Sequence, residues 1–215
     1  MKNGYNYNPQ KANLPKKVIA RKDTIIDVYR RITGTYSIPK EKQYWTLCAY
    51  QPDEEGAEIN QMVKEGLLTK KQFHGVDSTK VCIKCNKKCH PGAKWIHGKW
   101  NEAIKYCKNY NPALIYLDTI YMAGHSNAIK IALDTIKSPC QTGTILVINV
   151  ILTDYHRGIQ WPIKVFMNNL NQAMSPLQRE CWKFYPVENS KKACYTYQSS
   201  MAKMGTYILV KKESR

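Results

Sequence analysis

Residues 113–118 read Ala-Leu-Ile-Tyr-Leu-Asp, a short apolar run that stops at a carboxylate. A run of this kind, bounded by Pro112 and Asp118, is typical of a parallel strand that is covered on both faces. A second run, Thr-Ile-Leu-Val-Ile-Asn-Val-Ile-Leu at residues 144–152, is the most hydrophobic stretch of the chain. Between the two, Asn127–Ile136 carries apolar residues at helical spacing. The order strand, helix, strand predicts a sheet of mainly parallel strands.

The same alternation extends outward in both directions. Strands are expected over Tyr44–Ala49, Gln72–Val76, Ala93–His97, Trp182–Val187, Ala193–Gln198 and Thr206–Lys211. Helices are expected over Glu54–Leu68, Ser78–Cys89, Trp100–Asn109 and Ile163–Met174. The last two strands have no helix of comparable length between them, which predicts an antiparallel hairpin. The fold class is therefore α/β, with a mostly parallel sheet closed by a C-terminal antiparallel hairpin.

The N-terminal region differs from the rest in composition. Residues 1–17 are polar, basic and interrupted by two prolines, and Lys22–Ile32 has the spacing of a short amphipathic helix. No internal repeat is visible. We predict a basic N-terminal arm with a short helix over residues 1–43, followed by one domain over residues 44–215.

Positive charge is the main compositional feature, since the 215 residues carry a formal net charge of +17. From Lys80 to Lys108 there are eight lysines and one acid, Glu102. This imbalance favours a polyanionic partner, because neutralising phosphates releases condensed counterions. An acidic protein, a membrane surface or a merely solvated surface are the alternatives. The predicted nucleic-acid-binding residues are Arg21, Lys22, Lys84, Lys87, Lys88, Lys94 and Lys99.

Compartment and redox state are inferred from what the sequence lacks. No apolar run approaches the roughly 20 residues that a membrane-spanning helix needs, and the N-terminus has no apolar segment of a secretory signal. We expect a soluble, cytoplasmic protein with no membrane partner. Its eight cysteines are then expected to be reduced and packed. The sequence leaves the oligomeric state open.

Two expected strands end in an acidic residue, in Gly75-Val76-Asp77 and in Tyr116-Leu117-Asp118-Thr119. With the five βα units and the closing hairpin, Tyr44–Lys212 resembles a class I S-adenosylmethionine-dependent methyltransferase. The resemblance implies a single Rossmann-like three-layer sandwich that binds S-adenosylmethionine beyond the carboxyl ends of the strands. It does not by itself imply activity, since folds host many functions.

The resemblance also implies roles for particular residues. Asp77 would accept hydrogen bonds from the ribose hydroxyls, and Asp118 would line the substrate side as the catalytic residue. Gly98 and Trp100 would lie near the adenine, where Trp100 could stack. The loop after the first strand would contact the methionine portion through Cys48, Ala49, Tyr50 and Gln51. This loop departs from the family, because the glycine-rich GxGxG pattern is absent.

Structural alternatives accompany these roles. Either aspartate could instead cap a helix, and Trp100 could be a core residue. The stretch beginning at Asp118 lacks the [DN]PP[YFW] signature of amino-directed DNA methyltransferases. His74, His97 and His125 lie near expected strand ends, where any could act as a base. Aromatic side chains that could stack a base are Tyr50, Tyr121 and Trp161.

Two cysteine patterns invite a chemical interpretation. Pro139-Cys140-Gln141 matches the tripeptide of cytosine-C5 methyltransferases but follows the wrong element, and turn-forming neighbours explain it. Cys82, Cys85, Cys89 and His90 resemble a metal cluster, yet His90 would point away from a helix face shared by the three thiols. We expect no metal site and buried helix cysteines instead.

Two functions remain open at this point. One is an S-adenosylmethionine-dependent methyltransferase-like protein that acts on or binds nucleic acid. The other is a non-catalytic nucleic-acid-binding or assembly protein on a degenerate methyltransferase fold. The sequence does not decide whether the protein is an enzyme or whether its target is DNA, RNA or protein.

Overall fold

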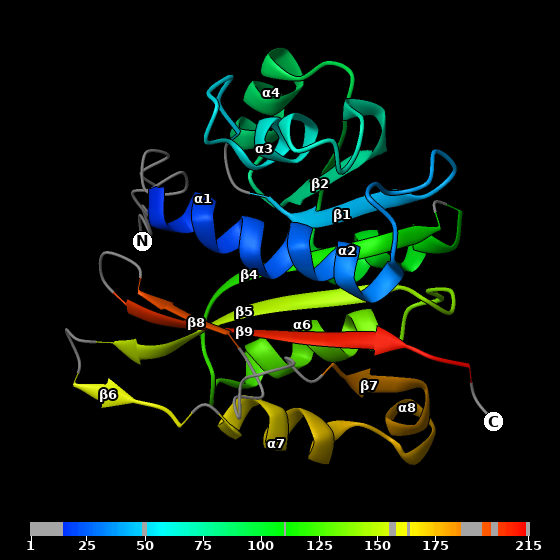
Figure 1. The fold of residues 1–215 in the computed structure, drawn as a ribbon. Helices are drawn as coiled ribbons and strands as arrows, with labels where there is room; N and C mark the ends of the chain where they lie inside the picture. The colour runs from blue at the N-terminus through cyan, green and yellow to red at the C-terminus, as the bar shows by residue number, and fades with distance from the viewer. Residues whose placement is uncertain are drawn as a thin grey trace.

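A mixed sheet runs through the whole molecule (Figure 1). The computed structural model describes residues 15–48, 51–109, 111–154, 158–162, 164–185, 195–198 and 202–213. Seven strands of this described part follow the order β3-β2-β1-β4-β5-β9-β7. Their bounds are β1 Gln43–Leu47, β2 Phe73–Asp77, β3 Lys94–His97, β4 Pro112–Met122, β5 Ile145–Asp154, β7 Trp182–Phe184 and β9 Ala202–Lys211.

Strands β1 to β5 pair in parallel, whereas β9 pairs antiparallel with both β5 and β7. Two further strands lie off the main path: β6 (Ile159–Gln160) pairs with the end of β5, and β8 (Tyr195–Gln198) pairs antiparallel with β9. The predicted α/β class, the mostly parallel sheet and the C-terminal antiparallel strands are therefore confirmed.

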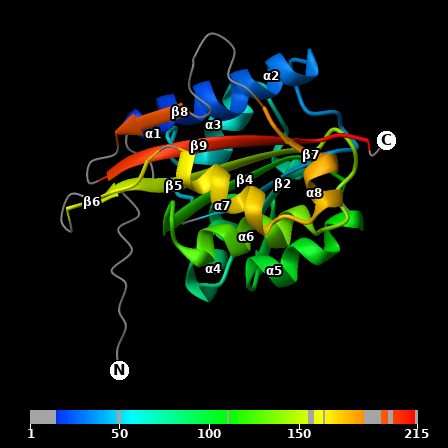
Figure 2. The same cartoon turned by 90° about the horizontal axis from the view of Figure 1, so that it is seen from below.

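Helices cover both faces of the sheet (Figure 2). One face carries α1 (Pro15–Arg21), the π-helix η2 (Lys22–Ile26), α2 (Asp27–Thr33), α3 (Glu58–Lys64) and α4 (Lys80–Cys89). The other carries α5 (Trp100–Ala103), the 3-10 helix η4 (Ile104–Asn109), α6 (Ser126–Ile136) and α7 (Lys164–Ala173). The remaining short helices are η3 (Lys70–Gln72) and α8 (Pro176–Cys181).

Alternating side chains along each strand feed two separate cores, as a sheet covered on both sides requires. Tyr44 is buried with Phe73 under the helices of the first face, and its neighbour Trp45 is buried with Ile115 under those of the second. The three-layer sandwich that the sequence predicts follows directly from this division.

The element boundaries show where local patterns were incomplete. Strand β4 continues to Met122, and α3 begins only at Glu58, four residues later than expected from its apolar spacing. Helix α8 was missed, although Ser175 and Gln178 form a capping box around Pro176. A reciprocal cap of this kind can start even a two-turn helix.

Strand β4 is irregular immediately after Asp118. Asp118 pairs with Asn149 and Met122 pairs with Ile151, so three residues of β4 face one residue of β5 between these pairs. A bulge of this kind bends the strand and changes the direction of the side chains that follow. The bulge lies at the carboxyl end of the sheet.

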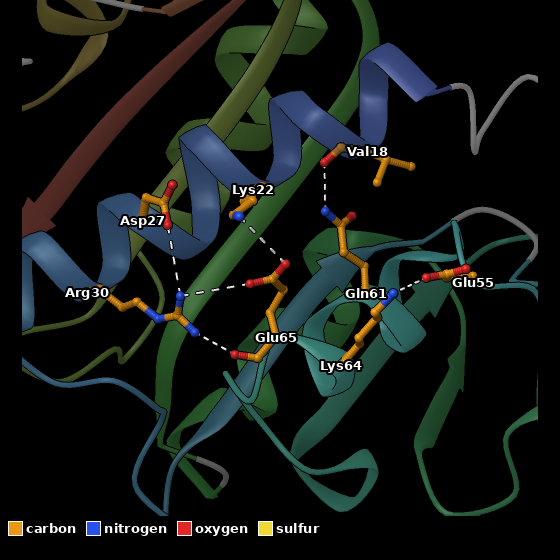
Figure 3. A network of polar contacts seen from close by, with 8 residues as sticks. All are labelled: Val18, Lys22, Asp27, Arg30, Glu55, Gln61, Lys64 and Glu65. Atoms are coloured by element: carbon orange, nitrogen blue, oxygen red, sulfur yellow. Dashed lines mark hydrogen bonds and ion pairs between the residues drawn. The ribbon is translucent and has the colours of Figure 1, made fainter.

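The N-terminal helical segment packs onto the sheet through Ile25, Ile26, Val28 and Tyr29, all of which are buried. Polar contacts add to this packing, as Figure 3 shows: Arg30 Nη2 donates to the Glu65 carbonyl at 2.5 Å. From Pro15 onward, the predicted arm therefore contributes to the core, while residues 1–14 lie outside the described part. The division at residue 43 stays a prediction.

Among the residues that the structure describes, no helix has both the length and the apolar character to span a bilayer.

Candidate functional site

The strand order places a topological switch point between β1 and β4. From β1 the chain proceeds to β2 and β3 on one side, and then returns to β4 and β5 on the other. In open α/β sheets, ligands bind beyond the carboxyl ends of the strands at such a point.

Asp77 ends β2 and pairs with His97 at the end of β3. Its Oδ1 accepts a hydrogen bond from the Thr79 backbone N–H at 2.5 Å, which helps to start α4. Burial raises the pKa of the half-buried carboxyl, and the nearby His97 opposes this rise. Asp77 is nevertheless not the N-cap of α4, which is Thr79; it accepts from the N–H of that residue in the turn before the helix. A carboxylate accepts several hydrogen bonds, so the ribose role of Asp77 stays a prediction.

The loop after β1 turns toward α4. The Cys48 N–H donates to the Val76 carbonyl at 3.1 Å, and the Gln51 N–H donates to Asn86 Oδ1 at 2.7 Å. His90 Nε2 lies 3.1 Å from the Gln51 carbonyl oxygen. Cys48 and Gln51 are both buried in these contacts, and burial raises the pKa of the Cys48 thiol well above its usual value. Ala49 and Tyr50 lie outside the described residues.

Gly98 and Trp100 follow β3 but have different environments. Gly98 is half-buried and donates its N–H to the Asp77 carbonyl at 3.0 Å. Trp100 is buried, packs edge-on against Trp45 and donates its indole N–H to Thr135 Oγ1 at 2.8 Å. Trp100 is therefore a core residue, which was the alternative to stacking on a purine.

Asp118 lies within β4, so it does not cap a helix. Asn149 Nδ2 donates to Asp118 Oδ1 at 3.4 Å and to the Tyr116 hydroxyl at 2.6 Å. Asn149 itself is buried, and Thr206 Oγ1 donates to its Oδ1 at 2.6 Å. Asp118 is half-buried at the end of this chain of hydrogen bonds. Such a network fixes the orientation of the carboxylate.

Arg21 and Glu58 lie close to the switch point, and neither was recognised there from the sequence. Arg21 is 3% exposed, and its Nη1 donates to the Gly56 carbonyl at 3.1 Å and to Gln61 Oε1 at 3.4 Å. The prediction that Arg21 contacts nucleic acid is therefore wrong. The sequence does contain a signal for the burial of Arg21: residues 21, 25 and 28 fall on one helix face, and residues 25 and 28 are apolar.

Glu58 is the first residue of α3 and is 4% exposed. It accepts a hydrogen bond from the Tyr44 hydroxyl at 2.8 Å. Burial raises the pKa of its carboxyl, the Arg21 charge lowers it, and the Asp118 charge raises it. Two carboxylates and one guanidinium thus share the region beside the ends of β1 and β4.

An aromatic pair follows the bulge. The rings of Tyr121 and His125 stack with centroids 5.2 Å apart and 19° between their planes. His125 Nδ1 accepts from the Asn127 N–H at 3.1 Å and so caps α6. Tyr121 stands three residues after Asp118, the spacing of the aromatic residue in the [DN]PP[YFW] signature. This spacing could have identified Tyr121 from the sequence as the aromatic residue that accompanies Asp118.

The predicted basic residues other than Arg21 are exposed. Lys84, Lys87 and Lys88 lie along α4, and Lys94 and Lys99 lie at the start and just beyond the end of β3. Lys22 has half of its side chain exposed and lies 3.9 Å from Glu65. Strand β3 is the edge of the sheet, and α4, which packs against it, lies at the same end of the molecule (Figure 1).

Of the two cysteine motifs, only His90 contacts the described part of the loop after β1, through the Gln51 carbonyl. Cys140 is buried in the loop before β5, at the amino end of the sheet and therefore opposite the switch point. Across the described residues, no group of three or more His, Cys, Asp or Glu side chains could hold a metal ion.

Comparison with known proteins bears on the fold. No family model and no curated protein matches the chain. Its structure is similar to the plantazolicin methyltransferase BamL solved with SAH, with a TM-score of 0.64 and 13% identity over 95% of this chain and 89% of that one. The N-methyltransferase NodS from Bradyrhizobium japonicum gives a TM-score of 0.57 and 10% identity over 94% and 99%. A TehB-like methyltransferase from Corynebacterium glutamicum gives 0.50 and 15% over 95% and 100%. The chain therefore has the fold of the class I S-adenosylmethionine-dependent methyltransferases.

Proposed function

We propose that this protein binds S-adenosylmethionine at the carboxyl edge of its sheet and methylates a nucleic-acid target. One observation carries the proposal: Asp77 at the end of β2 and Asp118 at the bulge within β4 are half-buried carboxylates on either side of β1 at the switch point. Support comes from the fold, which is shared with methyltransferases, one of them solved with SAH.

The residues of the site fit the adenosine half of the cofactor better than its methionine half. Asp77 would hold the ribose, because a carboxylate can accept from both hydroxyls of a cis-diol. Gly98 would line the same end. The loop after β1 lacks the glycine-rich sequence that would let its backbone come close to the methionine portion. Its described part is hydrogen-bonded to α4 and to His90 instead. The bound cofactor would supply an electrophilic methyl group on its sulfonium.

Asp118 and the aromatic pair would serve the target. Asp118, held by Asn149, would accept a hydrogen bond from an amino or hydroxyl group and orient it for attack. The stacked rings of Tyr121 and His125, which follow Asp118 in the chain, would offer a flat surface for a nucleobase. The lysines of α4 and β3 would bind the phosphate backbone near Asp77.

Calorimetry and thermal-shift measurements with S-adenosylmethionine and S-adenosylhomocysteine test the proposal. We expect binding by the wild type, at least tenfold weaker binding by Asp77→Asn, and retained binding without methyl transfer by Asp118→Asn. Asp134→Asn is the matched control, because Asp134 lies on α6 and pairs with Lys130 on that helix. Absence of both heat and thermal shift at millimolar cofactor would remove the enzymatic proposal.

A second candidate is nucleic-acid binding without methyl transfer. It is favoured by the attachment of the β1 loop to α4 and by the buried Arg21 and Glu58 beside the end of β1. A gel-retardation assay discriminates between the two. Salt-sensitive retardation that cofactor leaves unchanged, with no methyl transfer, would support this candidate.

A further inference from the structure

Two buried cysteines face each other at the amino end of the sheet, away from the candidate site. Cys107 belongs to η4, which leads toward β4, and Cys140 belongs to the loop between α6 and β5. Their sulfur atoms are 3.8 Å apart, although the residues are 33 positions apart in sequence. Both thiols are free in this structure. A disulfide needs about 2.05 Å between the sulfurs, so side-chain rotation has to close less than 2 Å.

The surroundings of the two thiols differ in a way that favours reaction between them. Ser138 Oγ lies 3.0 Å from Cys140 Sγ, and Lys211 Nζ donates to the Cys140 carbonyl at 2.5 Å. The hydrogen bond from Cys140 and the nearby Lys211 charge lower the pKa of Cys107 to about 7. The same contact, together with burial, raises the pKa of Cys140. The two sulfurs are thus within contact distance of each other and of the Ser138 hydroxyl, with a lysine charge nearby, the setting of a reactive pair.

Solvent reaches the cysteine pair only through a small exposed part of Cys140. Cys107 is fully buried, whereas Cys140 is 4% exposed and lies between two exposed residues, Pro139 and Gln141. A small oxidant can reach such a position more easily than a protein or a bulky reagent can.

We propose that Cys107 and Cys140 form a reversible disulfide when the protein meets a peroxide. One of the two sulfurs attacks one peroxide oxygen as a thiolate, breaks the O–O bond and becomes a sulfenic acid, while the other oxygen leaves as hydroxide and takes up a proton. The second cysteine then attacks that sulfur, and the sulfenic oxygen leaves as water. Two thiols lose two electrons and two protons in total, and hydrogen peroxide is reduced to two molecules of water.

The disulfide would tie η4 to the turn that precedes β5. Both segments lie before central strands of the sheet, so the bond restricts the unfolded chain over a closed loop of more than 30 residues. We expect the melting temperature to rise by about 5–10 °C on oxidation. The proposal concerns the opposite edge of the sheet from Asp77 and Asp118, so it stands or fails independently of the proposed function.

Peptide mapping of the full chain tests the proposal. Reduced protein is treated with hydrogen peroxide, denatured in the presence of N-ethylmaleimide so that buried free thiols are blocked, and digested without reduction for mass spectrometry. The expected product is a linked pair of peptides that contains Cys107 and Cys140 and that dithiothreitol separates. Cys107→Ala and Cys140→Ala should each abolish the link and the melting shift. Cys181→Ala is the matched control, because Cys181 is a half-buried free thiol in α8.

Recovery of both cysteines as unlinked maleimide adducts or as unlinked oxidised acids would overturn the proposal. So would a link from either residue to a different cysteine in preference to the pair. Should an alanine variant fail to fold, the wild-type peptide map and its reversal by dithiothreitol still decide the outcome.

Discussion

Replacing Arg21 with methionine should destabilise the protein by about 3 kcal/mol, the low end for removal of one member of a buried charged group. The side chain is 3% exposed and makes hydrogen bonds to the Gly56 carbonyl and to Gln61. Its charge also lowers the pKa of the buried Glu58. Methionine retains much of the apolar stem but removes the Arg21 hydrogen bonds to these two acceptors and the positive charge near the Glu58 carboxyl. In a domain of this size, the loss corresponds to about 6–12 °C in melting temperature.

The pH dependence of that loss identifies its cause. Burial raises the pKa of Glu58 in the folded protein above 4.5, so the folded state holds a proton that the unfolded state releases. Stability from this group is therefore present at low pH and is lost as pH rises through the folded pKa. Without Arg21 that pKa rises further. The difference in the free energy of unfolding between wild type and Arg21→Met should then be larger at pH 8 than at pH 5.

Urea denaturation of four proteins forms the assay: wild type, Arg21→Met, Glu58→Gln and the double variant. We expect the free energy of unfolding of the double variant to fall by less than the sum of the decreases in the two single variants. The difference, which is the coupling free energy, should be about 1–3 kcal/mol. Arg31→Met is the matched control, since Arg31 is exposed on α2 and should change stability by less than about 0.5 kcal/mol. A loss below about 1 kcal/mol for Arg21→Met, or strict additivity, would refute the reasoning.

Three further predictions concern the surface and the core. The predicted DNA contact is tested with the triple variant Lys84→Gln, Lys87→Gln, Lys88→Gln. Because each phosphate contact contributes about −0.9 to the slope of log K against log salt concentration, the slope should become less negative by about 2.7. An unchanged slope would exclude these lysines from the contact. Burial lowers the pKa of His74 to about 4. Since the unfolded chain takes up this proton first, stability should fall by up to about 3 kcal/mol between pH 6.5 and 4, and His74→Asn should flatten that decline in urea titrations. Gly75→Ala would place a methyl group 2.5 Å from a neighbouring indole ring, so a loss of about 1–3 kcal/mol is expected, and native stability in thermal melts would contradict it.

Much of the fold was predictable because its signals are local. The apolar runs of β4 and β5, and the helical spacing of α6, are properties of short segments that any tertiary arrangement must respect. The end of β2 at Asp77 was found for the same reason, whereas β4 continues past Asp118 to Met122. By contrast, the bulge after Asp118 depends on the register between β4 and β5, and no pattern within β4 encodes it.

The functional residues divide in the same way. Exposure of the lysines on α4 follows from charge alone, because an unpaired ammonium is costly to bury. Arg21 is an exception, because it is charged but buried. Its hydrogen-bond partners Gly56 and Gln61 lie 35 and 40 residues away in sequence, so the sequence did not reveal them. The core position of Trp100 likewise depends on Thr135, which only the packing of α5 against α6 brings near.

By itself the sequence determined the α/β class, the order of strands and helices, the positive charge and the two aspartates that follow apolar runs, since each follows from composition or short-range periodicity. Tertiary structure alone decided which groups meet: Glu58 with Tyr44, Asn149 with Asp118, and Cys107 with Cys140. The physical reason is that hydrogen bonds and sulfur contacts act over a few ångströms in space, and distance along the chain carries no information about them.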